Sequence, residues 1–283
     1  MKEVLLEIKK LTIGYGTGDN AKKVADNLDT CLFGGELVCL LGANGTGKST
    51  LMRTLCGFQP ALQGRVLIGD GDVHLLNERE LSRRISVVLT DRVVVPNASV
   101  EELVGYGRSP HTGLFGRFCE EDRQIIDRAM VLCGIEHKRK DLLSALSDGE
   151  RQKAFIAKAL AQDTPLIVLD EPTAFLDLPA RVEIMQLLRH IASGSGKSIL
   201  MSTHDLDLAL QMSDRLWLLR PGGPIQTGSP EDLSLRNAFQ TLFQNKGIVF
   251  DNRTGLFQVT HLTLPNKKLI HKILQRGTLN QSL

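Results

Sequence analysis

The chain carries at positions 42–50 the stretch Gly42-Ala43-Asn44-Gly45-Thr46-Gly47-Lys48-Ser49-Thr50. This stretch follows the pattern G-x-x-x-x-G-K-S/T, which is typical of loops that bind nucleotide phosphates. Its glycines let the backbone turn so tightly that several N–H groups point at one anion. Lys48 adds a positive charge for the outer phosphates, and the hydroxyl of Ser49 is a ligand for magnesium. The pattern therefore predicts a site for a nucleotide with Mg²⁺.

The residues on either side of this loop support the same interpretation. Residues 37–41 are a short apolar run, which predicts a buried strand that leads into the loop. Residues 50–56 have the pattern of a helix, and Gly57 is placed to end it. The phosphates are then expected at a helix N-terminus, where unpaired N–H groups and the helix dipole favour negative charge.

Length and composition exclude several classes of protein. A chain of 283 residues can bury a full core, as one large domain or two small ones. The net charge of +2 does not indicate nucleic acid as a partner. The sequence has no run of eighteen apolar residues, and its first residues lack the apolar segment of a signal peptide. We therefore expect neither a membrane span nor secretion.

The five cysteines form no C-x-x-C pair, and most of them lie in apolar stretches. This distribution favours buried free thiols in a reducing cytosol over disulfides. They are Cys31, Cys39, Cys56, Cys119 and Cys133.

The hydrophobic pattern predicts an α/β domain with a helical insertion at residues 90–160. Short apolar runs bounded by turn residues predict further strands, which fall near 4–13, 24–33, 65–68 and 85–89. Within the insertion, Ser99 and Glu102 have the spacing of a capping box that opens a helix. A second helix is expected at 120–133, because its apolar residues recur at helical spacing and Gly134 follows.

Two acids end another apolar strand, predicted at 165–169. They are Asp170 and Glu171, and ligands of open α/β sheets lie at the carboxyl ends of strands. Beside a phosphate loop, Asp170 is expected to hold magnesium, and Glu171 to deprotonate a water at the terminal phosphate. The simpler alternative is that two acids merely end a strand.

Three further positions are ambiguous when they are considered one at a time. His204 follows the strand predicted at 198–202, so it is either a structural histidine or a group beside the terminal phosphate. Tyr15 is suited to stack on a base, although its spacing alone favours packing on the core. Ser147 and Gly149 open a helix that is suited to bind an anion, although a plain capped helix is the simpler interpretation.

The C-terminal part of the chain is expected to hold two hairpins and a helix. Residues 215–219 and 225–227 predict one hairpin, and residues 230–246 predict a helix. Residues 248–250 and 256–259 are expected to pair with each other. The basic stretch at 261–283 is expected to be a solvated, poorly ordered tail.

Taken in this order, the motifs resemble the ATP-binding cassette (ABC) family over roughly residues 3–230. The resemblance implies a P-loop NTPase fold with a RecA-like core, an antiparallel β subdomain and the helical insertion, together forming an ATPase domain at 1–260. Residues 42–50 match the family's Walker A loop, and residues 166–170 match its Walker B strand. Glu171 then matches the catalytic glutamate.

The same resemblance gives roles to the ambiguous positions. Residues 146–152 match the signature motif, with Asp148 where glycine is commoner, and this implies ATP contacts from Ser147 and Gly149. Residues 174–177, which end at Asp177, match the loop that crosses the dimer interface. His204 matches the switch histidine and Tyr15 the base-stacking aromatic residue.

One position departs from the family pattern. The family usually has glutamine after the strand at 85–89, where it contacts magnesium and water and faces the permease. This chain has Thr90 there, followed by Asp91. Thr90 is retained as an expected magnesium ligand, although its side chain is shorter. We expect either that the loop lies closer to the phosphates or that a water or Asp91 fills the gap.

Within the family, residues 99–117 and 176–181 resemble the ATPase subunits that import iron-siderophores, haem or cobalamin. This resemblance implies a homodimer of cassettes on the cytoplasmic face of the inner membrane. It also implies a permease in separate chains and, indirectly, a periplasmic or surface substrate-binding protein. The permease and the binding protein select the cargo, so this sequence does not name it.

Two alternative functions are weaker. A soluble cassette ATPase not tied to transport, acting in translation or DNA repair, would resemble two fused cassettes or carry long coiled-coil insertions, and this chain has neither. A nucleotide sensor that does not hydrolyse ATP would be expected to lose Glu171 or His204, and both are present.

Overall fold

The computed structural model describes residues 3–90, 97–113, 116–242, 248–251 and 256–259. The chain forms two compact units, Met1–Leu233 and Ser234–Leu283. All of the predicted site residues belong to the first unit. The tail predicted at 261–283 lies outside the described residues.

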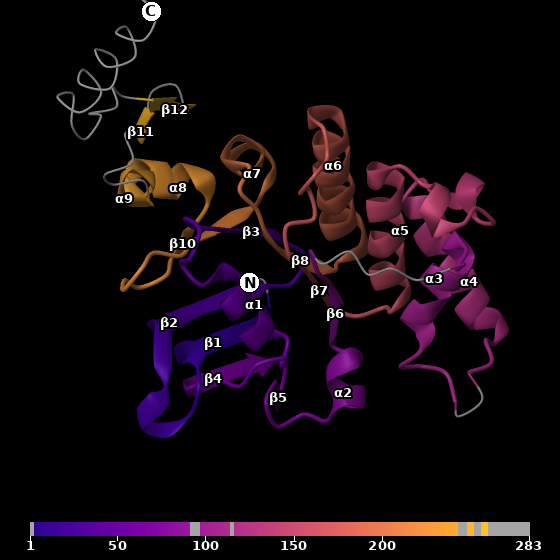
Figure 1. Ribbon diagram of the computed structural model, residues 1–283, viewed down its shortest axis with the longest axis horizontal. Helices are drawn as coiled ribbons and strands as arrows, with labels where there is room; N and C mark the ends of the chain where they lie inside the picture. The colour runs from indigo at the N-terminus through magenta and orange to yellow at the C-terminus, as the bar shows by residue number, and fades with distance from the viewer. Residues whose placement is uncertain (1–2, 91–96, 114–115, 243–247, 252–255, 260–283) are drawn as a thin grey trace, which may run out of the picture. The chain divides into compact units, whose positions relative to one another are not determined.

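The centre of the first unit is a six-stranded sheet in the order β10-β9-β3-β8-β7-β6 (Figure 1). The strands are β3 (Leu37–Leu41), β6 (Ile85–Val88), β7 (Leu166–Leu169), β8 (Ser198–Ser202), β9 (Arg215–Leu218) and β10 (Gln226–Gly228). All neighbours are parallel except β9 and β10, which form the predicted hairpin. Every residue of β3, β7 and β8 is buried, as expected for strands covered on both faces.

This strand order determines where the site forms. Parallel strands have their carboxyl ends at one edge of the sheet, and ligands of such sheets bind beyond that edge. The phosphate loop follows β3, the two acids follow β7, and the histidine follows β8. Because β8 lies between β3 and β7, these three connections are neighbours in space.

A second, antiparallel sheet has the order β2-β1-β4-β5. Its strands are β1 (Val4–Tyr15), β2 (Lys22–Phe33), β4 (Gln63–Ile68) and β5 (Gly71–Asp72). Buried residues of β1, among them Leu11 and Ile13, belong to the same hydrophobic cluster as Leu51 and Leu55 of α1 (Lys48–Leu55). The sheet therefore packs on the helix that follows the phosphate loop, and Gly57 ends that helix with a φ of +74°, as predicted.

The predicted helical insertion is present and forms one group of helices in Figure 1. Its main helices are α3 (Val100–Gly105), α4 (Glu120–Leu132) and α5 (Asp148–Ala161). Ser99 caps α3 in the predicted capping box with Glu102. An ion pair that the sequence did not suggest lies inside the insertion: the Nε of Arg108 is 2.8 Å from Oδ1 of Asp122, and both side chains are buried.

The remaining helices of the first unit are α2 (Glu78–Ser82), α6 (Leu178–Ser195) and α7 (Leu206–Met212). The cysteines of the described chain are all free thiols, as predicted, with Cys39, Cys56 and Cys133 buried and Cys119 exposed. Among the described residues, no helix is long and apolar enough to cross a membrane.

The end of the chain differs in one respect from expectation. The helical prediction for 230–246 is confirmed over most of its described part, residues 230–242, but as two short helices, α8 (Pro230–Leu235) and α9 (Ala238–Leu242). Asn237 separates them with a φ of +53°, a left-handed conformation that a continuous helix does not contain. The predicted pairing of the last two strands is confirmed, since β11 (Ile248–Asp251) and β12 (Leu256–Val259) are antiparallel.

Candidate nucleotide site

The phosphate loop runs from the end of β3 to the first residue of α1, and its shape depends on glycine. The N–H of Thr46 donates to the carbonyl of Ala43 at 3.2 Å, and the Thr46 hydroxyl donates to the same oxygen at 2.9 Å. A Cβ at Gly42 would lie 2.6 Å from the main-chain oxygen of Leu219, which no side chain can tolerate. Gly45 and Gly47 have φ values of +80° and +100°, in the region that favours glycine.

Lys48 begins α1 and connects the loop to the acids. Its Nζ donates to the carbonyl of Gly42 at 2.9 Å, and the residue is buried. Burial lowers the pKa of Lys48 below its ordinary value, and the nearby carboxylates of Glu171 and Asp170 oppose that shift. The two acids predicted as a separate motif therefore act electrostatically on the lysine of the phosphate loop.

The other loop residues leave an open approach to the N-terminus of α1. Asn44 and Ser49 are exposed, so the Ser49 hydroxyl is free to bind an incoming ion. The phenol of Tyr15 is hydrogen-bonded to the Thr50 hydroxyl at 2.8 Å, and half of the residue remains exposed. The core packing that spacing alone favoured for Tyr15 is therefore wrong, and the exposed ring is compatible with stacking on a base.

Asp170 extends β7 and is held on both sides by hydroxyl groups. Its main-chain N–H donates to Val88 at 2.8 Å, and its main-chain oxygen accepts from the Thr90 hydroxyl at 2.7 Å. On the other side, the hydroxyl of Ser202 donates to its Oδ1 at 2.6 Å. Thr90 is thus next to Asp170, and its hydroxyl hydrogen is donated to the main chain. Asp91 lies outside the described residues.

Glu171 and His204 contact each other across the connections after β7 and β8. The Nε2 of His204 lies 2.5 Å from Oε1 of Glu171. Glu171 has a φ of +49°, a conformation that is uncommon for a residue other than glycine. The structure therefore brings together the phosphate loop, both acids and the histidine.

The signature residues form a separate group on the insertion. Ser147 caps α5: its hydroxyl donates to the Glu150 carboxylate at 2.8 Å, and the N–H of Glu150 donates back to it at 3.3 Å. Asp177 caps α6 in a similar way, accepting from the N–H of Ala180 at 3.0 Å. Among the hydrogen bonds of the described residues, none joins Ser147 or Asp177 to the phosphate loop of the same chain.

Two residues at this edge of the sheet were missed by sequence reasoning. Ser202, the last residue of β8, contacts both acids. Arg181 of α6 donates to the carbonyl of Leu176 at 2.9 Å and lies 3.4 Å from the carboxylate of Asp205. Ser202 belongs to no recognisable motif, and Arg181 was identified only as part of the stretch 176–181 that resembles importer subunits, with no role of its own. The contacts of both residues follow from the strand order and the helix placement.

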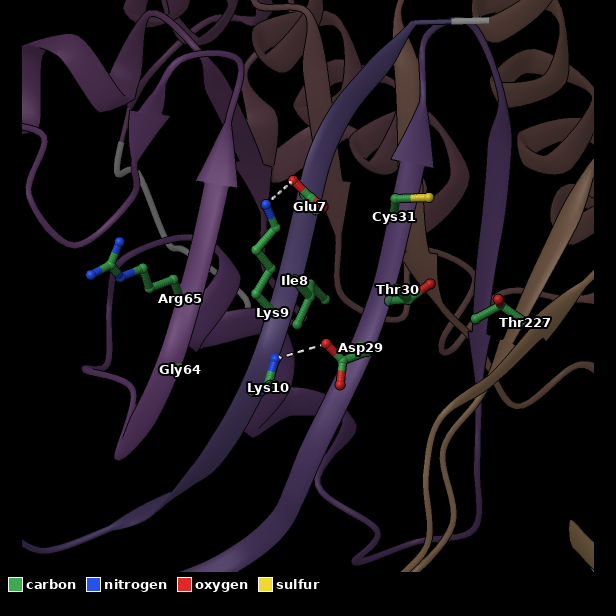
Figure 2. A pocket seen from close by; sticks show the side chains of 10 residues that line it. All are labelled: Glu7, Ile8, Lys9, Lys10, Asp29, Thr30, Cys31, Gly64, Arg65 and Thr227. Carbon is green, nitrogen blue, oxygen red and sulfur yellow. Dashed lines mark hydrogen bonds and ion pairs between the residues drawn. The ribbon is translucent and has the colours of Figure 1, made fainter. Parts of the chain in front are cut away.

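A cavity of about 760 Å³ lies elsewhere, along the antiparallel sheet (Figure 2). It is lined by residues of β1, β2 and β4, with Thr227 of β10. Lys9 pairs with Glu7 there at 2.8 Å, and the N–H of Lys10 donates to Asp29 at 2.9 Å. None of the predicted site residues lines this cavity, so it is separate from the phosphate loop.

The sequence of residues 25–174 matches the family described as ABC transporter, which covers just over half of the chain. The chain belongs to the ABC transporter family. It is accordingly an ATP-binding cassette ATPase.

Individual ABC proteins are similar over most of the chain. The iron(3+)-hydroxamate import ATP-binding protein FhuC of Bacillus subtilis is 34% identical, over 88% of this chain and 92% of that protein. The cobalamin import ATP-binding protein BtuD of Halobacterium salinarum is 35% identical, over 85% of this chain and 60% of that protein. The dimeric structure of the bacterial ABC cassette MJ0796 is 25% identical with a TM-score of 0.69, covering 80% and 99% of the two chains.

Proposed function

We propose that this protein is the ATPase subunit of an ABC importer for an iron-siderophore, haem or cobalamin. One observation carries the ATPase part: Lys48, Glu171 and His204 converge at one edge of the sheet. The importer part is supported by the names of the hydroxamate and cobalamin relatives, which match most of this chain. A soluble ABC ATPase not tied to transport is the alternative.

The hydrolysis reaction follows from the chemistry of these groups. The oxygen of the attacking water bonds to the terminal phosphorus while Glu171 accepts a proton from that water. The bond between the terminal phosphorus and the ADP oxygen breaks in the same reaction. His204 stabilises the terminal phosphate, and Tyr15 stacks on the base. Ser49, Asp170 and Thr90 are the proposed ligands of Mg²⁺. Hydroxyl and carboxylate oxygens suit that ion, which neutralises phosphate charge when bound.

Among the described residues, no hydrogen bond joins Ser147 to the phosphate loop of its own chain, and this supports a composite site between two copies. In a head-to-tail homodimer, Ser147 and Gly149 of one copy face the ATP on the phosphate loop of the other, and Asp177 lies at the interface. The solved dimeric cassette supports this assembly. The exposed N-terminus of α5 can then donate N–H groups to the terminal phosphate of the second copy.

The proposed partners are integral-membrane permease chains that convert closure of the dimer into alternating access. The protein then lies on the cytoplasmic face of the inner (plasma) membrane as a peripheral subunit. A periplasmic or surface substrate-binding protein completes the system indirectly. No nucleic acid is involved. A permease is expected to copurify with the tagged protein from a detergent extract. If no permease copurifies, the soluble alternative is favoured.

The ATPase assignment is tested with Glu171→Gln. The amide keeps the shape of the side chain but cannot accept the proton, so the variant is expected to bind ATP, lose turnover and accumulate as a dimer. Gel filtration with ATP and magnesium measures the accumulation of the dimer, and an ATP hydrolysis assay measures turnover. The wild-type protein and a magnesium-free run are the controls. A monomer peak together with normal hydrolysis would contradict the role of Glu171.

A further inference from the structure

We propose that Ser202 is a positioning residue for ATP hydrolysis, acting through Asp170 and Glu171. Its Oγ donates to Oδ1 of Asp170 at 2.6 Å and accepts from the main-chain N–H of Glu171 at 2.9 Å. A single hydroxyl therefore uses its one hydrogen on the magnesium ligand and a lone pair on the general base. This inference rests on the proposed roles of those two acids.

The sheet topology explains why Ser202 can reach both acids. Leu169 of β7 is the parallel partner of Met201 of β8, so the next residues along the two strands, Asp170 and Ser202, are also neighbours. Side chains alternate along a strand, and Ser202 is on the opposite face from Met201. The side chain of Ser202 is fully buried, so bulk water cannot replace its hydroxyl at this position.

The hydrogen bond from the N–H of Glu171 to Ser202 matters because the backbone of Glu171 has an unfavourable conformation. A φ of +49° is unfavourable for a glutamate, and such a conformation persists only where its surroundings hold it. Glu171 is held by the Ser202 hydroxyl on its N–H and by the His204 imidazole at its carboxylate, and its main-chain oxygen accepts from the N–H of Ala174 at 3.0 Å. Without the hydroxyl, the N–H of Glu171 loses its partner and the backbone can relax, which turns the carboxylate away from the attacking water.

The chain offers a matched control on the same strand. Ser198 is the first residue of β8, is also fully buried, and also bridges two groups: it accepts from the N–H of Gly35 at 2.9 Å and donates to the carbonyl of Phe33 at 3.0 Å. It lies at the opposite end of the strand from the acids. Ser198→Ala therefore removes an equivalent buried hydroxyl without touching the site.

The experiment compares Ser202→Ala, Ser202→Thr and Ser198→Ala in steady-state ATP hydrolysis, ATP affinity and thermal unfolding. We expect Ser202→Ala to lower kcat about 10–100-fold, as the loss of one hydrogen bond to a charged group predicts, with ATP affinity within about twofold of wild type. Ser202→Thr keeps the hydroxyl and is expected to restore kcat to within about threefold. Ser198→Ala is expected to lower the Tm by about as much as Ser202→Ala does, but to keep kcat within about twofold of the wild-type value.

Equal kcat values for Ser202→Ala and Ser198→Ala would overturn the proposal, because the hydroxyl would then serve stability alone. A Thr variant that folds but is no more active than the Ala variant would also overturn it. Failure of the proposed function would give a different result. In that case Glu171→Gln, measured in the same assay as the Ser202 variants, would hydrolyse ATP at the normal rate.

Discussion

Substitution of Asp122 by asparagine in the helical insertion is expected to be strongly destabilising. Asp122 accepts from the Arg108 guanidinium at 2.8 Å, and the two side chains are only 8% and 7% exposed. Arg108 also donates to the carbonyl of Ala161 at 2.9 Å, so the pair joins α4 to the end of α5. Removing the carboxylate charge leaves a buried guanidinium without its counter-charge, which costs about 3–5 kcal/mol.

Asp127→Asn is the matched control, on the same helix. Asp127 also pairs with an arginine, Arg139, at 2.6 Å, but its side chain is 53% exposed. Water screens that pair, so its loss is expected to cost no more than about 1 kcal/mol. For a chain of this size, each kcal/mol corresponds to a Tm shift of about 2–4 °C. Asp122→Asn should therefore lower the Tm by about 6–20 °C, and Asp127→Asn by at most about 4 °C.

Thermal unfolding of the nucleotide-free protein, followed by circular dichroism, measures both shifts. A double variant, Arg108→Met with Asp122→Leu, removes both buried charges and is expected to recover most of the lost stability. The reasoning is refuted if Asp122→Asn costs no more than Asp127→Asn, because burial would then make no difference to the worth of the ion pair.

Three further predictions concern the nucleotide. Lys48→Ala is expected to weaken ATP binding by about 1.5–3 kcal/mol through the lost charged contact, and an unchanged affinity in titration calorimetry would contradict this. Ser147→Arg should abolish hydrolysis but leave ATP binding to the single chain intact, so loss of binding by the monomer would rule out the composite site. Thr90→Ala loses one hydrogen bond to Asp170 and should slow basal hydrolysis less than about tenfold, with a larger effect on permease-stimulated turnover. A collapse as deep as that of Glu171→Gln would make Thr90 a direct catalytic ligand.

At Thr90, the motif comparison predicted the departure from the family but not the contact that the side chain makes. The sequence identified the residue as a departure from the family, and the short side chain raised the question of how the gap is filled. The structure adds that the Thr90 hydroxyl donates to the main-chain oxygen of Asp170, which is 80 positions away in the sequence. Which group completes the magnesium site stays a prediction.

The sequence by itself determined the phosphate loop, the buried strands, the helical insertion and the acids after β7. These features are local: glycine spacing, apolar runs and capping boxes are encoded within a few residues, and the order of the motifs limits the fold to one family. The break at Asn237 was missed because an asparagine within a helical pattern gives no clear stop.

Only the tertiary structure decided which distant residues meet. The strand order puts β8 beside β7 and so places Ser202 against Asp170, but a serine at the end of an apolar strand has no distinctive pattern. Arg108 and Asp122 look like ordinary surface charges until packing of the helices buries them together. Such contacts depend on the sum of all packing interactions in the folded chain, and for this reason no short stretch of sequence specifies them.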